Sequence, residues 1–349
     1  MRQRIVRHFL ADRGVEAFIT ENIPIGLTQS PFLAEKLAAV IAEKIQKQGH
    51  TKGPFHIYEL ACGLGYLTKF TMDRLKSRYP KVYKKCKFHV TDLSKRDLKA
   101  LVDSGLFDVH RGHIVFESAD AGRLSFSSSP TFVYFTYLLD SLPTHHIAYK
   151  DGQLYEVQIE TRIPDSAKLV DSSGPELAVL LADQIAEKLQ NPAWDVALAP
   201  SYLNVLVETI HLVPLAEGSL SKHDQNVLTS FLKEHPTDND FCFNYTPGID
   251  GFLKVLSAYP GCDTVFLDLG YFSPGETPFI RPDCLAGQYG VTLFFPLYVP
   301  LLRFLAERHQ LPVTVFEQPQ ETNFVAHLGS TSLQKMHTFS LPLQSRFED

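Results

Sequence analysis

The clearest structural signal in the sequence is the stretch Glu59-Leu60-Ala61-Cys62-Gly63-Leu64-Gly65-Tyr66-Leu67-Thr68. It begins at the end of an apolar-rich run, 55–60, which is typical of a buried strand, and it leads into helical spacing that continues to about residue 78. Ala61, Gly63 and Gly65 are small, so the backbone can turn sharply there and a ligand can approach its N–H groups closely. The stretch therefore predicts a strand, a tight turn and a helix arranged around a ligand.

Strands and helices alternate on both sides of this turn. Before it, apolar residues recur at helical spacing from Thr28 to Gln48, and Ser30-Pro31 is a suitable start for that helix. After it come a helix that begins near Ser94 and three predicted strands, at 87–91, 114–116 and 131–136. This alternation predicts an α/β fold, a Rossmann-like parallel sheet with helices on both faces.

The alternation breaks after the fourth strand. Two alternating runs between 145 and 159 flank Asp151-Gly152, a dipeptide that favours a hairpin turn. Helices are predicted at 175–189 and 219–232 with irregular chain between them, and a last pair of strands at 264–268 and 312–316. Because no linker-like composition divides the chain, we expect one large domain with an insertion rather than two packed lobes. The expected parts are an N-terminal helical segment (1–50), a ligand-binding half of the sheet (51–143), a hairpin and helical insertion on the substrate side (144–245) and a C-terminal half (246–349).

Composition narrows the class of protein. The net charge of −6 over 349 residues gives no basic field for a phosphate backbone, so we expect no nucleic-acid partner. The five cysteines are scattered without a Cys-x-x-Cys pair, which argues against structural zinc and disulfides and favours a reducing compartment. We also expect no membrane span, because no apolar run is long enough. A soluble, cytoplasmic protein is the main expectation, while the basic start Met1 to Arg7 leaves the mitochondrial matrix as an alternative and a homodimer stays open.

The residues of the turn also indicate the kind of ligand. A dinucleotide fingerprint would have glycine where Thr68 stands, and a P-loop would have Gly-Lys-Ser/Thr, which is missing. Glu59 is an acid in a buried strand, and a buried charge needs a partner. S-adenosylmethionine (SAM) offers positive ammonium and sulfonium groups to that acid and a carboxylate to the helix N-terminus. We therefore predict SAM as the cofactor, with a ligand-free tight turn as the alternative.

Two further acids follow predicted strands. Asp92 could accept hydrogen bonds from both ribose hydroxyls, or it could merely cap the next helix. Ser94 suffices as that cap, so we expect Asp92 to be free for the ribose. Asp120 could accept from the adenine amino group or be an ordinary turn aspartate, and both interpretations stay open. The predicted cofactor-binding residues are Glu59, Ala61, Gly63, Gly65, Asp92 and Asp120.

The end of the fourth strand is the predicted place of the methyl acceptor, because an open parallel sheet presents its reactive edge there. The stretch Thr136 to Pro143 contains Tyr137 and Asp140, our candidate catalytic residues. His145 and His146 follow and could supply a base, although paired histidines entering a strand are more often surface or core residues. Displacement at a sulfonium methyl needs alignment and desolvation of the acceptor but no metal, so we predict no metal site. The acceptor could be a protein side chain or a small-molecule nitrogen or oxygen.

With these residues in view, the chain resembles the MidA family of SAM-dependent methyltransferases, whose eukaryotic members are mitochondrial assembly factors for respiratory complex I. The resemblance runs from about Ala17 to Ala326 and begins with Phe18-Ile19-Thr20. Glu59 to Thr68 is similar to the glycine loop of the family. Three further segments resemble its motifs: Thr91-Asp92-Leu93-Ser94, Leu138-Leu139-Asp140-Ser141-Leu142-Pro143 and Phe266-Leu267-Asp268-Leu269-Gly270-Tyr271. The resemblance implies a class I methyltransferase sheet, SAM as cofactor and symmetric methylation of a protein arginine.

The departures from the family lie on the acceptor side. Thr136-Tyr137 stands where the family has Asn-Glu, the segment Gly287 to Thr292 keeps only fragments of a family motif, and little beyond Arg281 remains of a basic stretch. Carboxylates are needed to hold a guanidinium, which stays charged above pH ~12. Tyr137 removes one of them. Three hypotheses follow: a methyltransferase, a SAM-binding assembly or interaction protein without turnover, and a nicotinamide dehydrogenase, which Glu59 and Thr68 disfavour.

Overall fold

The computed structural model describes residues 2–14, 30–49, 53–171, 178–191, 194–237, 239–273, 286–289, 292–317 and 323–338. The family-like segment 18–20, Arg281 and residues 290–291 lie outside the described residues. The chain forms two compact units. The first comprises residues 1–24, 144–245 and 273–296, and the second comprises 25–143, 246–272 and 297–349.

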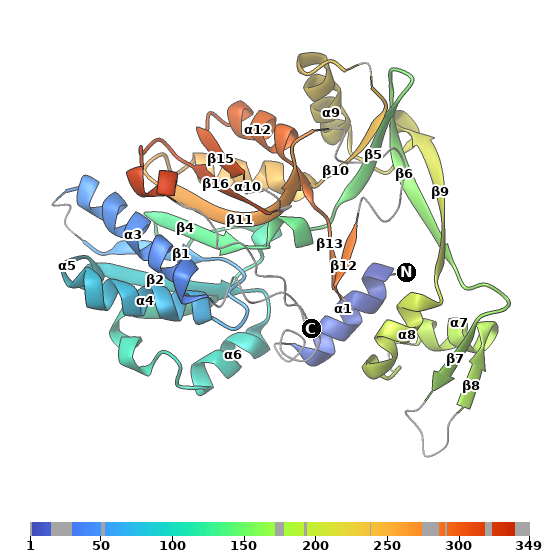
Figure 1. The fold of residues 1–349 in the computed structure, drawn as a ribbon, viewed down its shortest axis with the longest axis horizontal. Helices are drawn as coiled ribbons and strands as arrows, with labels where there is room; N and C mark the ends of the chain where they lie inside the picture. Colours follow the sequence, from blue (N-terminus) through green and yellow to red (C-terminus); the bar gives the residue numbers. More distant parts are fainter. Residues whose placement is uncertain are drawn as a thin grey trace. The chain divides into compact units, whose positions relative to one another are not determined.

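The second unit contains the large sheet that the sequence predicts. Its strand order is β15-β16-β11-β4-β1-β2-β3, with β14 paired on β11 (Figure 1). The pairs between β3, β2, β1, β4 and β11 are parallel, and β16 is antiparallel to both of its neighbours. The strands are β1 (Phe55–Glu59), β2 (Cys86–Asp92), β3 (Ile114–Ser118), β4 (Phe132–Thr136), β11 (Asp263–Tyr271), β14 (Leu297–Tyr298), β15 (Val313–Glu317) and β16 (Asn323–Leu328). The α/β class with a mainly parallel sheet is thus confirmed.

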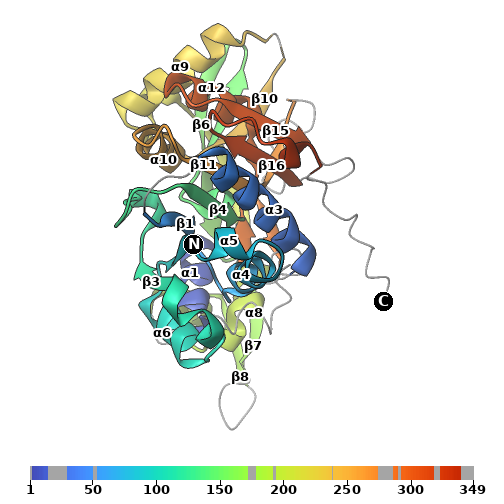
Figure 2. The ribbon, with the colours of Figure 1, turned by 90° about the vertical axis from the view of Figure 1, so that its left-hand side faces the viewer.

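Amphipathic helices cover this sheet. Ser30 begins α3 as predicted, because its side chain accepts a hydrogen bond from the backbone N–H of Phe32 and Pro31 occupies the first turn. The buried face of α3 is apolar, and the helix lies along α4 (Figure 2). The helices of the unit are α3 (Pro31–Lys47), α4 (Tyr66–Arg78), α5 (Pro80–Tyr83), α6 (Lys95–Asp103), α10 (Pro247–Ser257) and α12 (Val299–Arg308).

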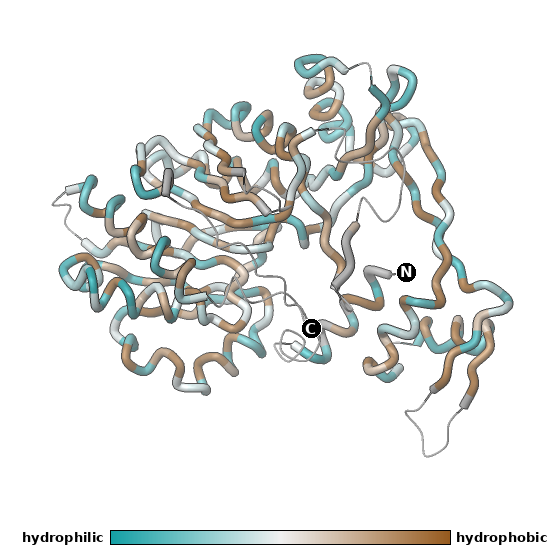
Figure 3. The backbone as a smooth tube through the Cα atoms, in the orientation of Figure 1, coloured by the Kyte–Doolittle hydropathy of each residue, from teal (hydrophilic) through white to brown (hydrophobic). Residues whose placement is uncertain are grey.

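The first unit is built on an antiparallel sheet of order β10-β5-β6-β9. Its β5–β6 hairpin turns at Asp151 (φ 49°) and Gly152 (φ 78°), so the predicted hairpin is confirmed. Helix α9 turns an apolar face inward, and brown and teal alternate along its tube in Figure 3. The strands are β5 (His145–Lys150), β6 (Gln153–Arg162), β7 (Lys168–Asp171), β8 (Ala178–Leu181), β9 (Val207–Pro214), β10 (Phe241–Tyr245), β12 (Gly287–Tyr289) and β13 (Thr292–Phe294). The helices are α1 (Arg2–Arg13), α7 (Ala182–Gln190), α8 (Ala199–Asn204) and α9 (Lys222–Glu234).

Three of our expectations about the later chain are wrong. The predicted helix 175–189 begins only at residue 182, because the short apolar run 178–181 pairs with β7 as a strand. The chain between the two predicted helices is not irregular, since it contains α8 and β9. The last two predicted strands are not neighbours, because β16 inserts between β11 and β15.

None of the helices in the described part of the chain combines the length and the apolar character that crossing a bilayer requires.

Candidate cofactor and acceptor site

The turn between β1 and α4 has the tight geometry that its small residues predict. Ala61 (φ 51°), Gly63 (φ 51°) and Gly65 (φ 71°) all adopt left-handed backbone conformations. A side chain at Gly65 would meet Leu101 at 2.8 Å, whereas a Cβ at Gly63 would meet nothing within 4 Å. A side chain at Gly65 would therefore force Leu101 to shift and would strain the backbone, whereas Gly63 borders open space in which a ligand can lie.

Glu59 is buried directly beneath this turn, with 4% of its surface exposed. The hydroxyl of Thr68 donates a hydrogen bond to its carboxylate and is itself bonded to the hydroxyl of Tyr134. Burial raises the pKa of Glu59 to about 8, and the nearby Asp92 charge adds to the rise, while bonds from Thr68 oppose it. The partner that we expected for this buried acid is thus a hydroxyl, and Glu59 holds a proton at neutral pH.

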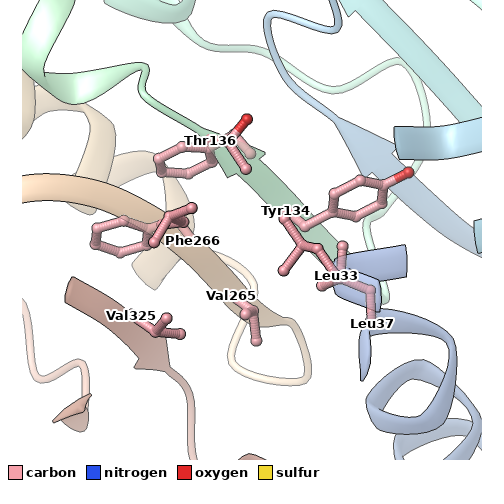
Figure 4. A pocket seen from close by; sticks show the side chains of 9 residues that line it. Leu33, Leu37, Tyr134, Thr136, Val265, Phe266 and Val325 are labelled. Carbon is pink, nitrogen blue, oxygen red and sulfur yellow. The ribbon is translucent and has the colours of Figure 1, made fainter. Parts of the chain in front are cut away.

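Tyr134 also borders a small hollow between α3 and the sheet (Figure 4). Apart from Tyr134 and Thr136, its lining is apolar and comes from α3, β4, β11 and β16. The lining contains neither Glu59 nor Asp92, so this hollow is not the predicted cofactor site. It is a packing gap beside Tyr134, the last of the three hydrogen-bonded side chains Glu59, Thr68 and Tyr134.

Asp92 is not free, contrary to our expectation. Its carboxylate accepts hydrogen bonds from the backbone N–H of Gly63 (3.2 Å) and from that of Ser94 (3.0 Å). Ser94 does cap α6, because its hydroxyl oxygen accepts from the N–H of Asp97 at 3.2 Å. The carboxylate of Asp92 therefore fastens the glycine turn to the end of β2. An ionised carboxylate offers about four acceptor positions, so it keeps capacity for ligand hydroxyls.

Leu93 is a candidate that the sequence interpretation missed. It follows Asp92 directly, and 70% of its surface is exposed. A large apolar side chain beside a polar loop is a suitable surface for a flat ring system. The signal in the sequence was its position between the strand-ending acid and the helix cap, where no buried face requires an apolar residue.

Asp120 is exposed and begins a short 3-10 helix, η2 (Ala121–Arg123). Its side chain accepts from the backbone N–H of Gly122 at 2.8 Å, as in an ordinary aspartate turn. The turn role is therefore observed, and one carboxylate oxygen is committed to it.

The acceptor-side candidates lie at the ends of β4 and β11. Tyr137 has a left-handed backbone (φ 50°), and its N–H donates to the carbonyl of Leu267 at 2.8 Å. Asp140, in the 3-10 helix η3 (Leu139–Ser141), is 2% exposed and is hydrogen-bonded to the carboxyl group of Asp268. We expected Asp140 to face an acceptor, but its side chain is directed to Asp268.

Asp268 is a site residue that we did not single out. It is fully buried in β11, and its oxygens accept from the N–H groups of Leu139 and Leu269, each at 2.9 Å. Burial and the charge of Asp268 raise the pKa of Asp140 well above its ordinary value.

His145 and His146 have partners within the first unit. Nδ1 of His145 lies 2.9 Å from Glu156, and Nδ1 of His146 lies 2.7 Å from Asn244. These bonds agree with a structural rather than a catalytic role for both residues.

The loop residues fit SAM as a group. Glu59 and Asp92 bring two acids to one turn. The charge of Asp92 raises the pKa of Glu59, and both acids raise the pKa of the Cys62 thiol, so negative charge is costly here. A ligand with two positive groups relieves that cost, and the space beside Gly63 admits it.

Comparison with known proteins agrees with this geometry. Residues 36–219 match the model of a family described as "Putative S-adenosyl-L-methionine-dependent methyltransferase". The chain belongs to this family. It is a SAM-dependent methyltransferase with SAM as its cofactor, as the glycine turn predicted. A search of curated proteins finds no match.

Two solved structures from Burkholderia thailandensis share the fold of this methyltransferase. One is an uncharacterized protein with a TM-score of 0.56 and 12% identity, covering 89% of this chain and 83% of its own. The other, described as a "likely methyl transferase" and solved with S-adenosyl-homocysteine, has a TM-score of 0.55 and 12% identity over 88% of this chain and 79% of its own.

Proposed function

We propose that this methyltransferase is of the MidA type and methylates a nitrogen of a protein arginine. The observation that carries the proposal is the contact between Asp140 and Asp268. These acids belong to the two segments, 138–143 and 266–271, whose resemblance to the MidA family is the most specific. Their meeting at one edge of the sheet supports a shared acceptor site.

The cofactor residues have separate parts in this proposal. Ala61, Gly63 and Gly65 accommodate the methionine portion of SAM. Glu59 lies beneath them as the acid that balances the positive charge of SAM. Asp92 accepts from the ribose while holding the turn. The adenine ring packs on Leu93, and Asp120 accepts from its amino group with the oxygen that its turn leaves available.

Methyl transfer from SAM requires little of the protein beyond positioning of the acceptor. SAM supplies a methyl group that is already activated for displacement. The chain has to align the acceptor nitrogen and exclude water from it. Tyr137, at the end of β4, is the side chain that we assign to this task, because its ring can pack over a cationic group.

A second function is favoured by a specific observation. The buried Asp140 is bonded to Asp268 and does not extend a carboxylate toward a guanidinium, and Tyr137 replaces a family acid. Both features suit a SAM-binding interaction protein without turnover. A small-molecule nitrogen or oxygen acceptor, which needs no carboxylate clamp, is the remaining variant of the first function.

The test is calorimetric titration with SAM, S-adenosylhomocysteine and NAD, followed by incubation with methyl-labelled SAM and arginine-containing proteins. We expect both adenosyl ligands to bind, NAD not to bind, and label to appear on arginine. Binding without label on any acceptor would support the interaction protein. A folded chain that binds neither adenosyl ligand would refute both.

Asp92→Ala tests the ribose assignment in the same titration. Loss of charge-assisted bonds worth about 1.5–3 kcal/mol should weaken SAM by roughly ten- to a hundredfold. Asp120→Ala removes the proposed adenine contact at an exposed position, so a smaller loss of affinity is expected there. Unchanged SAM affinity in a folded Asp92→Ala variant would remove Asp92 from the site.

We expect the enzyme to work in the cytoplasm, with the mitochondrial matrix as the alternative, and as a monomer or a homodimer. Sedimentation of the purified chain distinguishes the two assembly states.

A further inference from the structure

Two buried acids from distant parts of the sequence meet at the acceptor edge of the sheet. Asp140 follows β4 and Asp268 lies in β11, and these strands are paired in register with Leu267 opposite Thr136. Asp140 is 2% exposed and Asp268 is 0% exposed, and their carboxyl groups are hydrogen-bonded to each other. Two carboxylates in contact cannot both be ionised away from water, so the pair holds at least one proton.

The hydrogen bonds around the pair assign that proton to one side. Asp268 accepts backbone N–H bonds from Leu139 and Leu269, as an ionised carboxylate does. Asp140 therefore carries the proton and donates it to Asp268. In the part of the chain that the structure describes, no lysine, arginine or histidine forms an ion pair with either acid.

Titratable side chains of β4, of β11 and of the neighbouring helix α10 have contacts of their own. Tyr134 is bonded to Thr68, Asp263 to His327, Tyr271 stacks on Tyr298, and Asp250 of α10 is bonded to His309. The charged group that shifts the pKa of Asp140 is Asp268.

The pair lies next to the strained residue of the acceptor side. Tyr137 has φ 50°, a conformation that costs an ordinary side chain free energy and persists only where its surroundings impose it. The bond from its N–H to Leu267 and the bond from Leu139 to Asp268 join both ends of its turn to consecutive residues of β11. The turn that presents Tyr137 is therefore held by β11.

We propose that Asp140 and Asp268 form a one-proton latch that positions Tyr137 at the acceptor edge. The inference rests on the proposed function, which puts the methyl acceptor at that edge. Both acids act through Tyr137, so they are positioning residues. The latch is closed while Asp140 keeps its proton and opens when the proton is lost, because two facing carboxylates repel each other.

The latch makes the two asparagine variants unequal. In Asp140→Asn the amide N–H₂ replaces the acid O–H as donor to Asp268, so the bond survives without a titratable proton. In Asp268→Asn an amide with only one acceptor oxygen faces the N–H groups of Leu139 and Leu269 together with the Asp140 acid. That variant should lose the latch.

The experiment is amide hydrogen exchange of the segment 136–142 in the wild type and both variants, as protection factors from pH 6 to pH 9. We expect Asp268→Asn to lower protection at least tenfold at pH 6, where the wild-type latch is closed, and Asp140→Asn to stay within about twofold of the wild type at that pH. Protection should fall with rising pH in the wild type and stay level in Asp140→Asn.

Equal effects of the two variants, or a wild-type profile as level as that of Asp140→Asn, would overturn the latch. If Asp268→Asn does not fold, the comparison of wild type with Asp140→Asn still decides the question. None of these readouts needs methyl transfer, and SAM titration of the wild type tests the proposed function separately.

Discussion

Glu59 shows how a single residue of this methyltransferase couples cofactor charge to protons. It is buried beneath the glycine turn, and Thr68 supplies a hydroxyl rather than a cation as its partner. Its pKa of about 8 means that the ligand-free chain keeps the proton near neutrality. A cationic ligand favours the ionised form, so binding and proton loss are linked.

SAM binding should therefore release a proton at pH 7. Affinity should rise by up to about tenfold per pH unit toward pH 8 and level off above it, because only the ionised Glu59 answers the ligand charge. Calorimetry in two buffers of different ionisation enthalpy measures the proton count. Glu59→Gln, which cannot titrate, should bind SAM more weakly with no proton release.

The same shift predicts the stability of the ligand-free chain. The folded pKa of Glu59 is raised, so its contribution is complete below the unfolded carboxyl pKa of about 4.3 and declines as the pH rises to about 8. Glu59→Gln should flatten this part of the profile. A wild-type proton count of zero on binding, with an unchanged profile in Glu59→Gln, would contradict the assignment.

At the scale of elements, the turn between β1 and α4 divides two tasks between two glycines. Gly65 packs against Leu101 and Phe107, and a methyl group there would approach Leu101 to 2.8 Å. Gly63 has the same left-handed backbone, but open space surrounds it. Stability and ligand access are therefore separable within one loop.

Alanine variants of the two glycines should separate these effects. Gly65→Ala combines left-handed strain of roughly 1–2 kcal/mol with overpacking of roughly 1–3 kcal/mol, so it should mainly lower the free energy of unfolding. Gly63→Ala has only the strain but puts a methyl group into the ligand space, so it should mainly weaken SAM binding. Denaturant unfolding and SAM titration of both variants measure the two effects. The same ratio of stability loss to affinity loss in both variants would rule out the division.

The elements that the sequence predicted are those with strong local signals. The 3.6-residue spacing of α3, its Ser30-Pro31 start and the Asp151-Gly152 turn were sufficient, because they depend on neighbouring residues alone. Strand β16 and the start of α7 were missed or misplaced. Short apolar runs such as 178–181 fit either type, and pairing with a distant strand decides between them.

In the candidate site, too, the local features could be predicted from the sequence and the long-range contacts could not. The glycine turn and Ser94 could be interpreted from spacing, because each acts on residues near it in sequence. The bond from Gly63 to Asp92 and the pairing of Asp140 with Asp268 could not, since they depend on which strands become neighbours in the sheet. The sequence therefore pointed to Asp92 and Asp140 but could not show the partners that the sheet gives them within the protein, and it did not single out Asp268.

At the scale of the molecule, the sheet unit is assembled from three separate stretches of chain, and one buried ion pair joins them. Lys44 of α3 is 3% exposed and pairs with the fully buried Asp263 of β11. Lys44 also bonds Thr331 at 2.7 Å, and His327 of β16 bonds Asp263 at 2.9 Å. Burial alone would raise the pKa of Asp263, but the bonds from His327, Lys44 and Thr331 hold it below its ordinary value.

Lys44→Met should destabilise the unit by about 3–5 kcal/mol, because it leaves Asp263 buried without its cation. The exposed pair Lys99–Asp103 is the matched control, and Lys99→Met should change stability by no more than about 0.5 kcal/mol.

The depressed pKa of Asp263 predicts how this stability difference depends on pH. Its contribution is present above the unfolded carboxyl pKa of about 3.9 and is lost as the pH falls through the lower folded value. Denaturant unfolding from pH 3 to pH 7 should show a difference between wild type and Lys44→Met that shrinks toward acid. A difference that is small at pH 7, or equal to that of Lys99→Met, would mean that β11 and α3 are joined by apolar packing alone.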